Sequence, residues 1–397
     1  MKKMIHKATH LLLALFALCS SVVTFQSCIE PPLKLPAEDV LVDIPAIVTD
    51  MEVVWNLDID WKHRWHYGWD EKDEELFGNI SYPQPTSFEV RRHYLGELPG
   101  GKPISYDGFT IFGNRFRRSY QFGYYDLLLW SNIDSKDGSQ VLVVDESDPL
   151  SVQAFTTVTR GISRGKKDDA ESRAVIALYN QPEIFYSTYP RDIYISRNKA
   201  DYDYFDEEEK CWVKSINCVL NPLVYIYLVQ VILINNDGRV TGTSGNAALS
   251  SVASSVDVNT GHTGMNPAMV YFNTRYKSDM TYENAPADII GSMLTTFGMC
   301  DMASYSDAPS HQYNGSRTDL KNQLMVDLSF RNGTEKTLTF DVTDQCHTQA
   351  HGGIITVVVD CKDIEMPDVP IEEGTGSLFV PTVEDYDEVI YEIPIGY

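Results

Sequence analysis

The sequence predicts an all-β protein built from two tandem β-sandwiches with little helix. In many short stretches apolar residues recur at every second position, which is the period of a strand with one buried face. Turn-forming residues separate these stretches at intervals of roughly ten residues. No stretch of a dozen residues follows the 3.6-residue period of an amphipathic helix. The spacing favours sandwiches and leaves a barrel open as the alternative.

The N-terminus has the features of an export signal. Three lysines within the first seven residues form a positive segment, and Leu11–Phe25 follows with few polar side chains. This apolar run has 15 residues, fewer than the ~20 that a helix needs to span a bilayer. Gln26 and Ser27 then lead into Cys28. Residues 1–27 are therefore predicted to be a lipoprotein signal peptide.

Cys28 is the predicted lipid-attachment site. A free thiol after a short apolar run is what a lipoprotein-processing peptidase needs, because the sulfur takes a diacylglycerol before cleavage. The mature chain would begin at Cys28 and be held at the outer membrane by acyl chains such as palmitate. The sequence does not predict whether it lies on the cell surface or on the periplasmic face. The alternative is a plain secretory signal in which Cys28 is incidental, since Phe25 replaces the usual leucine.

The charge of the chain limits its partners. The whole sequence has 32 basic and 56 acidic residues and a formal net charge of −24. Three lysines leave with the signal, so the mature chain carries −27. Such a charge repels phosphates, which argues against nucleic acid and anionic head groups as ligands. A hydrophobic content of 43% is ample for packed cores.

Composition divides the mature chain into four parts. Residues 28–48 are proline-rich and are predicted to form an extended tether. An N-terminal β-sandwich follows at 49–205, and a C-terminal one at 206–368. Residues 369–397 form a tail.

The first sandwich opens with a clear alternation at Val53–Trp61. Later strands are predicted at Ser87–Tyr94, Phe109–Phe112, Tyr120–Ser131, Gln140–Asp145 and Ser151–Thr159. Arg160–Arg173 and the acidic stretch Asp201–Glu209 are predicted to be surface connections.

The second sandwich has its own series of strands. They are predicted at Cys211–Val219, Val224–Asn235, Met269–Tyr276, Gly291–Phe297, Gln323–Phe330, Lys336–Val342 and Ile354–Asp360. Asn332 and Gly333 form the strongest hairpin signal, because both residues accept positive φ.

The tail ends in one more strand-like segment. Val389, Tyr391, Ile393 and Ile395 alternate with other residues, and Pro394 cannot donate to a ladder. This segment is therefore predicted to be an edge strand. It either closes its own sheet or pairs with another subunit.

The cysteines indicate no metal site. Cys211, Cys218, Cys300, Cys346 and Cys361 remain after Cys28, and none forms a C-x-x-C pair. Cys211 and Cys218 in one strand would lie about 23 Å apart, too far for a disulfide. Buried thiols are expected, and any other disulfide pairing stays open.

Few residues suggest catalysis, so no enzyme activity and no cofactor is predicted. His63 and His66, close to Asp70, could bind a metal, but no third ligand is evident. Aromatic packing explains this stretch better. The acids of Asp201–Glu209 could collect calcium, although they lack the glycine of an EF-hand-like loop.

Aromatic residues support an alternative function, the binding of glycans. Tyr120, Phe122, Tyr124 and Tyr125 lie close together and could stack on sugar rings. On a strand, however, half of such a group faces the core.

Several short motifs follow one another in a recognisable order. They are the lipoprotein-like start, Trp55–Trp61, Phe122–Asn132, Thr296–Gly298 and Phe340–Gln345. Together they resemble the fimbrillin-like lipoproteins of anaerobic Gram-negative bacteria, specifically an uncharacterised family (domain-of-unknown-function family 5119) near the fimbrillin anchor proteins. The resemblance implies two transthyretin-like β-sandwiches and a fimbrial anchor or accessory subunit, active in cell adhesion and pilus assembly.

The resemblance also implies that other fimbrial subunits bind by strand pairing, with Val389, Tyr391, Ile393 and Ile395 as the contact. In the stalk subunits of this family an arginine-directed protease removes the N-terminal strand. Here the mature chain has no arginine before Arg64. A cut there would remove the first core strand, so an anchor that keeps its lipid is expected rather than a stalk subunit.

Overall fold

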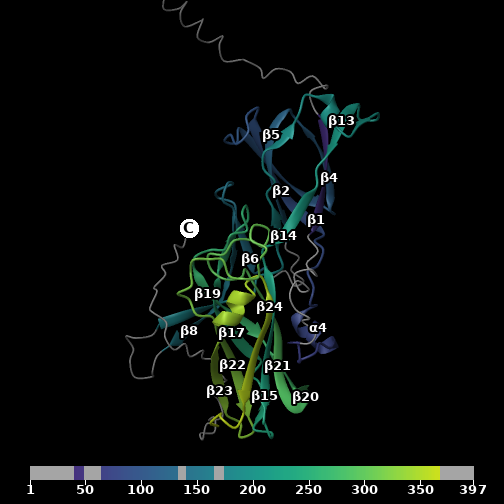
Figure 1. The fold of residues 1–397 in the computed structure, drawn as a ribbon. Helices are drawn as coiled ribbons and strands as arrows, with labels where there is room; N and C mark the ends of the chain where they lie inside the picture. The colour runs from purple at the N-terminus through teal and green to yellow at the C-terminus, as the bar shows by residue number, and fades with distance from the viewer. Residues whose placement is uncertain (1–39, 49–63, 133–139, 165–173, 367–397) are drawn as a thin grey trace, which may run out of the picture. The chain divides into compact units, whose positions relative to one another are not determined.

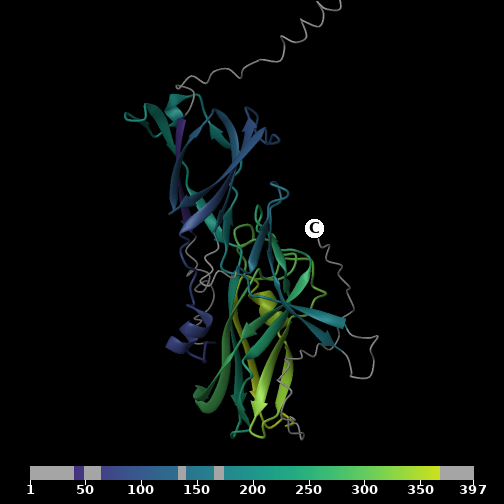
Figure 2. The same cartoon turned by 180° about the vertical axis from the view of Figure 1, so that it is seen from behind.

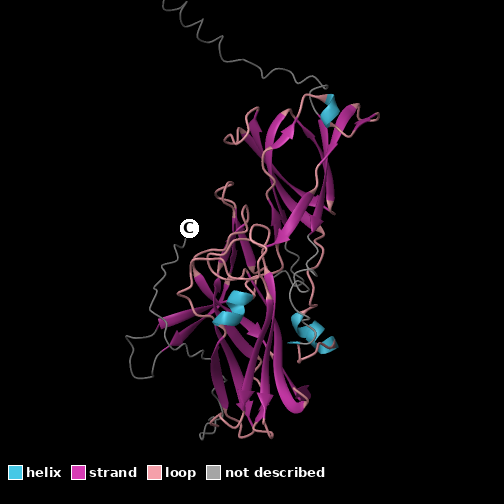
Figure 3. Ribbon diagram, in the orientation of Figure 1, coloured by secondary structure: helices cyan, strands magenta, loops and turns pink. Residues whose placement is uncertain are grey.

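The computed structural model describes residues 40–48, 64–132, 140–164 and 174–366. Over this part of the chain the protein is mostly β, with 52% strand and 6% helix (Figure 3). The predicted β-rich class with little helix is confirmed, and the tandem transthyretin-like arrangement stays a prediction. No helix in these ranges is long and apolar enough to cross a bilayer.

The described residues fall into two compact units. The first unit contains residues 40–43, 117–123 and 194–215. Its elements are the start of β1 (Val40–Val48), most of β4 (Arg115–Tyr120), the end of β11 (Ile193–Ile195), the 3-10 helix η2 (Lys199–Asp201), β12 (Tyr204–Asp206) and β13 (Cys211–Ser215). Within it β12 runs antiparallel to β13, and β1 runs parallel to β13 on its other side.

The second unit contains the other described residues and most of the strands (Figure 1). Its first elements are α4 (Glu71–Phe77), β2 (Ser87–Gly96), β3 (Ser105–Phe112), β5 (Gly123–Ser131), β6 (Leu142–Asp145), β7 (Gln153–Thr156), β8 (Val158–Arg164), β9 (Ala174–Tyr179) and β10 (Tyr186–Thr188). The later ones are β14 (Cys218–Pro222), β15 (Tyr225–Ile234), β16 (Val240–Gly242), β17 (Asn246–Ala253), β18 (Ser255–Asp257), β19 (Pro267–Asn273), β20 (Arg275–Tyr282), β21 (Ala285–Thr296), β22 (Gln323–Phe330), β23 (Glu335–Asp341), α5 (Thr343–Thr348) and β24 (Gly353–Asp360).

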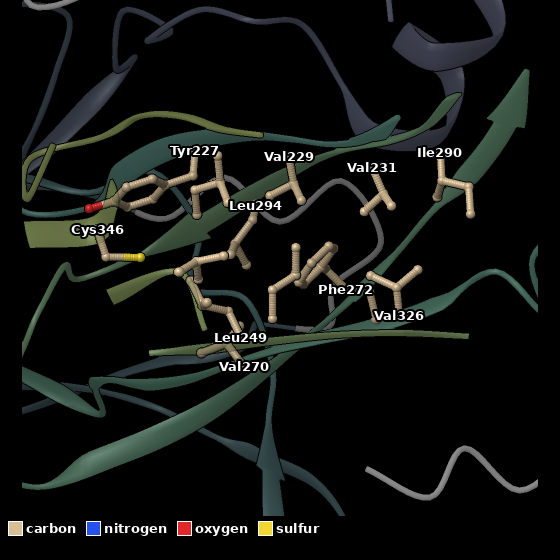
Figure 4. Close-up of a cluster of buried hydrophobic side chains, with 14 of the residues drawn as sticks. Tyr227, Val229, Val231, Leu249, Val270, Phe272, Ile290, Leu294, Val326 and Cys346 are labelled. Carbon is tan, nitrogen blue, oxygen red and sulfur yellow. The ribbon is translucent and has the colours of Figure 1, made fainter. Parts of the chain in front are cut away.

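Two sheets of the second unit face each other as a sandwich. One has the strand order β20-β21-β15-β24, and the other has β16-β22-β17-β19-β9-β8 with β23 beside β22. Figure 4 shows the apolar layer between them, where Val229 and Leu294 of the first sheet face Leu249, Val270 and Val326 of the second. Each aliphatic side chain buried here stabilises the fold by about 1.5–3 kcal/mol.

Strand β15 is buried on both faces, which explains why its sequence is apolar apart from Gln230. Tyr227, Val229 and Val231 point into the sandwich core. Leu228 and Ile232 alternate with them and belong to a separate cluster on the outer face of the sheet. A segment from much earlier in the sequence covers that outer face, as described below.

The hairpin predicted at Asn332 and Gly333 is confirmed. It joins β22 to β23, which pair along all of β23. Gly333 has a φ of 80°, whereas Asn332 keeps a negative φ and accepts the backbone N–H of Thr334 on its side chain. The turn therefore needs positive φ at one residue only.

Most predicted strands of the described part are found, but several boundaries differ. Val40–Val48, assigned to the tether, forms β1, because it pairs with β13 and β14. Arg160–Arg164, predicted to be a loop, belongs to β8. The acidic stretch Asp201–Glu209 contains β12.

The cysteine prediction needs a related correction. Cys211 and Cys218 lie in two strands, β13 and β14, rather than in one. All five described cysteines are free thiols; four are buried and Cys211 is half-buried. The division into sandwiches at residues 205 and 206 stays a prediction. The strand predicted at Val53–Trp61 lies outside the described residues.

Candidate functional site

Several residues that the sequence singled out lie outside the described ranges. These are Cys28, His63 and the tail strand with Val389, Tyr391, Ile393 and Ile395. The site is therefore built from surfaces that the structure describes. Two features of the four-stranded sheet carry it: the covering segment, which we define as residues 64–80, and the outer edge of β24.

A buried glutamine holds the covering segment against β15. The carboxamide oxygen of Gln230 accepts the backbone N–H groups of His66 and Tyr67 at 2.9 and 3.3 Å. Its nitrogen donates to the carbonyl of Arg64 at 2.7 Å and to the hydroxyl of Thr356 at 2.9 Å. Gln230 is fully buried, so this one side chain satisfies backbone groups that β15 itself cannot reach.

A charged cluster fixes the helical end of the segment to β20. Asp73 of α4 is fully buried, and its two oxygens lie 2.7 Å from Arg275 and 2.6 Å from Lys277. Asp70 caps α4 and contacts the same two cations at 2.6 and 3.0 Å. The two positive charges thus lie against two negative ones. Figures 1 and 2 show α4 beside β20 and β21.

Tyr67 lies at the centre of this cluster. Its hydroxyl donates to Asp73 at 2.7 Å, and the ammonium of Lys277 lies 4.0 Å from its ring centre. Burial, followed by the hydrogen bond to Asp73, raises the pKa of Tyr67 far above its ordinary value. The hydrogen bond from Arg275 is the main cause that lowers the pKa of Asp70. Each charged side chain of this cluster contacts one of opposite charge. The cluster therefore positions the covering segment and offers no unpaired acid or base for catalysis.

A glycine in β21 makes room for Tyr67. A Cβ atom on Gly291 would overlap the Tyr67 ring, although the backbone of Gly291 is ordinary strand. The close approach of ring and backbone, rather than a special φ, therefore requires glycine here.

The outer edge of β24 is partly covered by the side chains of Gln345 in α5 and Gln349, the C-cap residue of α5. Gln345 donates to the carbonyl of Thr356 at 2.9 Å and accepts its N–H at 2.8 Å. Gln349 does the same for Ile354, at 3.0 and 2.9 Å. Each carboxamide thus imitates a residue of a neighbouring strand. Two positions further along the same edge, Val358 is 43% exposed, and no described residue bonds its backbone.

The metal candidates have structural partners. Asp70 is held by Arg275 and Lys277, and the ring of His66 packs edge-on against Tyr282. In the acidic stretch, Asp206 accepts the N–H groups of Glu208 and Glu209. Within the described residues no group of three or more His, Cys, Asp or Glu side chains could hold a metal ion.

The aromatic group proposed for glycan stacking does not form a surface. Tyr120 and Tyr125 are buried, with exposed fractions of 1% and 4%. Phe122 and Tyr124 are half-buried. The group is also not on one strand, as the predicted strand Tyr120–Ser131 would require: Tyr120 ends β4, Phe122 lies in the connection, and Tyr124 and Tyr125 are in β5.

Sequence reasoning missed the covering segment and the glutamine caps. Two signals could have found the covering segment: a glutamine inside the apolar run of β15, and Asp70 followed three residues later by Asp73, which is a capping-box pattern. Neither signal names its partner, because the contacts join residues more than a hundred positions apart.

Comparison with solved structures finds several chains to which this chain is distantly similar. A structure described as a putative adhesin from Bacteroides ovatus is 13% identical, with 83% of this chain and 94% of that chain covered and a TM-score of 0.46. Another, from Bacteroides thetaiotaomicron, is 10% identical, with 82% and 93% covered and a TM-score of 0.41. The fimbrial anchor protein Mfa2 from Porphyromonas gingivalis is 12% identical, with 81% and 93% covered and a TM-score of 0.36. No family model matches the chain, and no curated protein matches it.

Proposed function

We propose that this chain is a non-enzymatic outer-membrane lipoprotein that serves as a fimbrial anchor or accessory subunit. Cys28 carries the lipid, and the protein binds other fimbrial subunits by strand pairing. The order of sequence motifs supports the family, including family 5119 and its two transthyretin-like sandwiches at 49–205 and 206–368. The open end of the β24 edge at Val358 is the structural observation that carries the binding role.

Strand pairing suits this edge for a physical reason. An extended segment laid beside β24 would gain ladder hydrogen bonds and bury alternate side chains against the sheet. The carboxamides of Gln345 and Gln349 already bind this edge as a strand would. A partner strand that begins at Val358 would therefore extend the hydrogen bonding that these two glutamines already make to Ile354 and Thr356.

The lipid anchor is tested by fractionation. Cys28→Ala should move the protein from the membrane fraction to the soluble one, because the acyl chains are its anchor. Cys19→Ala is the matched control, since that cysteine lies within the predicted signal peptide. Unchanged fractionation of the Cys28 variant would exclude lipidation at this residue.

The binding role is tested by two disruptive variants and one control. Val358→Pro removes an outward N–H from the edge of β24, and Val358→Thr keeps it. Deletion of Asp385–Tyr397 removes the tail strand. Each disruptive change should reduce incorporation into fimbriae, measured on purified fimbriae. Normal assembly of the truncated chain would mean that the tail strand closes its own sheet.

Glycan binding is the second candidate, and one aromatic pair favours it. Phe205 and Trp212 face each other across β12 and β13 with ring centres 5.3 Å apart, and Phe205 is 36% exposed. A glycan array separates the two functions. Saturable binding that Trp212→Ala abolishes would support a glycan-binding lipoprotein.

A further inference from the structure

Strand β3 forms an open edge of its sheet. Among the described residues it pairs with β2 alone, over all eight of its positions. Two of its exposed side chains are aromatic. Tyr106 is 61% exposed and Phe112 is 83% exposed. Both lie on the same face, because they are an even number of residues apart.

The hydrogen bonds of β2 show which backbone groups of β3 point outward. Gly113 donates to the carbonyl of Thr86, one position beyond the register pair Ser87–Phe112. The carbonyl of Ser87 points the other way and accepts from Asn132. Since antiparallel pairs alternate, the odd residues of β3 bond to β2. The even residues, Tyr106, Gly108, Thr110 and Phe112, therefore direct their N–H and C=O groups away from the sheet, where no described residue pairs with them.

Three other edges in the described part of the chain are at least partly blunted. On β24, Gln349 and Gln345 cap the positions of Ile354 and Thr356, which leaves Val358 open. Strand β20 is interrupted between Lys277 and Met280, and β16 has only three residues and a register shift. Soluble proteins commonly blunt exposed edges in these ways.

Strand β3 has none of these devices. It contains no proline, and its register with β2 is unbroken. Its one charge, on Asp107, is bound by Arg92 through two hydrogen bonds of 2.9 and 2.8 Å. A long, regular and electrically neutral edge with exposed aromatic residues is a ready template for another strand.

We propose that β3 pairs antiparallel with β3 of a second copy of this chain, about a two-fold axis at Phe109. This register places Tyr106 opposite the partner's Phe112, and Gly108 opposite the partner's Thr110. All of these residues are even-numbered, so every outward N–H and C=O from Tyr106 to Phe112 gains a partner. The proposal does not depend on the fimbrial role.

Side chains favour a second copy as the occupant. The register buries the two most exposed aromatic rings of β3 against each other twice, and aromatic cross-strand pairs stabilise sheets. Asp107 lies opposite the partner's Ile111, so no like charges are opposed. The strand is thus complementary to itself.

The test replaces one outward N–H. Thr110→Pro removes a donor to the second copy and leaves the ladder to β2 intact, because the N–H of residue 110 points away from β2. Thr110→Val is the matched control: it too loses the hydroxyl that donates to Glu89, but it keeps the N–H. Sedimentation of the full-length protein in detergent should show a dimer for the wild type and for Thr110→Val. Thr110→Pro should weaken the dimer about tenfold or more.

A second measurement tests the register. In a Cys211→Ser background, Phe109→Cys should form an intermolecular disulfide under mild oxidation. Residue 109 faces itself at a Cα separation near 4.5 Å, within disulfide range. Thr110→Cys should cross-link far less, because residue 110 faces residue 108. A monomeric wild type, a Thr110→Pro variant that remains fully dimeric, or equal cross-linking at both positions would overturn the proposal.

Discussion

The buried carboxylate of Asp73 lies 2.7 Å from the guanidinium of Arg275, two residues separated by 202 positions in the chain. This contact joins α4 to β20 and closes the covering segment over the four-stranded sheet. Loss of the negative charge would leave Arg275 and Lys277 close together with one remaining acid.

Asp73→Asn should therefore destabilise the protein by about 3 kcal/mol, at the lower end of the cost of breaking a buried ion pair. The reason is that both cations retain some contact with solvent. Urea unfolding of the two proteins measures the difference. Asp70→Asn is the control, since Asp70 has the same partners but is 47% exposed, and its effect should be smaller. Equal effects would mean that burial of Asp73 does not matter.

Gln230→Leu should loosen the covering segment. Leucine fills similar space but leaves the N–H groups of His66 and Tyr67 without an acceptor, at about 1–3 kcal/mol for each group that stays buried. Hydrogen exchange should become faster at these two amides. Gln230→Glu still accepts both N–H groups but cannot donate to Arg64, so it should protect the amides better than leucine does. Unchanged exchange in the leucine variant would contradict this account.

Gly291→Ala should destabilise the fold by about 1–3 kcal/mol, because the new methyl group overlaps the Tyr67 ring and must displace it. Gly242→Ala in β16 is the matched control, since a Cβ there meets no atom within 4 Å. Thermal unfolding of both variants checks the prediction. A loss of similar size at both positions would point to backbone effects instead of Tyr67.

Acidification should destabilise the protein below about pH 6.5 through His351. This ring is fully buried; its nitrogens lie 3.1 and 3.2 Å from the carbonyls of Ser310 and Ala303. The His351 ring also packs in T-shaped arrangements with the rings of Tyr225 and Tyr305. Burial is the largest influence and lowers the pKa of His351, while the carbonyls raise it and His311 lowers it further.

The sign follows from the lowered value. Between the folded and unfolded pKa values the unfolded chain binds more protons, so stability is full above about pH 6.5 and falls as the pH drops. The slope attributable to one group is at most about 1.4 kcal/mol per pH unit. Unfolding free energies measured between pH 7.5 and 5.5 should be level at first and then fall below about pH 6.5, and His351→Gln should reduce that fall. If His351→Gln kept the full wild-type slope, His351 would not be a cause of the acid destabilisation.

Strand positions were largely predictable from sequence because alternation reports one buried face. Ser87–Tyr94, for example, matches β2 closely. The same reasoning placed β15 but could not explain its second apolar face, since the residues that cover it come from the chain near Tyr67. Periodicity carries no information on such distant contacts.

Helix α4 escaped sequence analysis for a different reason. Seven residues are too few to display a helical period, and an isolated helix of this length would not be stable. Its stability comes from the Asp70 cap and from Arg275 and Lys277 on a distant strand. Gln345 and Gln349 were equally hidden, because only the turn between α5 and β24 brings them to the strand edge.

The sulfur atoms offer a way to watch these parts open. Cys346 and Cys361 belong to the sandwich core and Cys300 to a separate apolar cluster. Burial raises the pKa of Cys300 to about 12 and that of Cys361 to about 11, so an alkylating reagent reacts with them only when their surroundings come apart. Half-buried Cys211 is labelled first. Mass spectrometry of the modified peptides would then measure the opening rate of each core separately, with no need to introduce new cysteines.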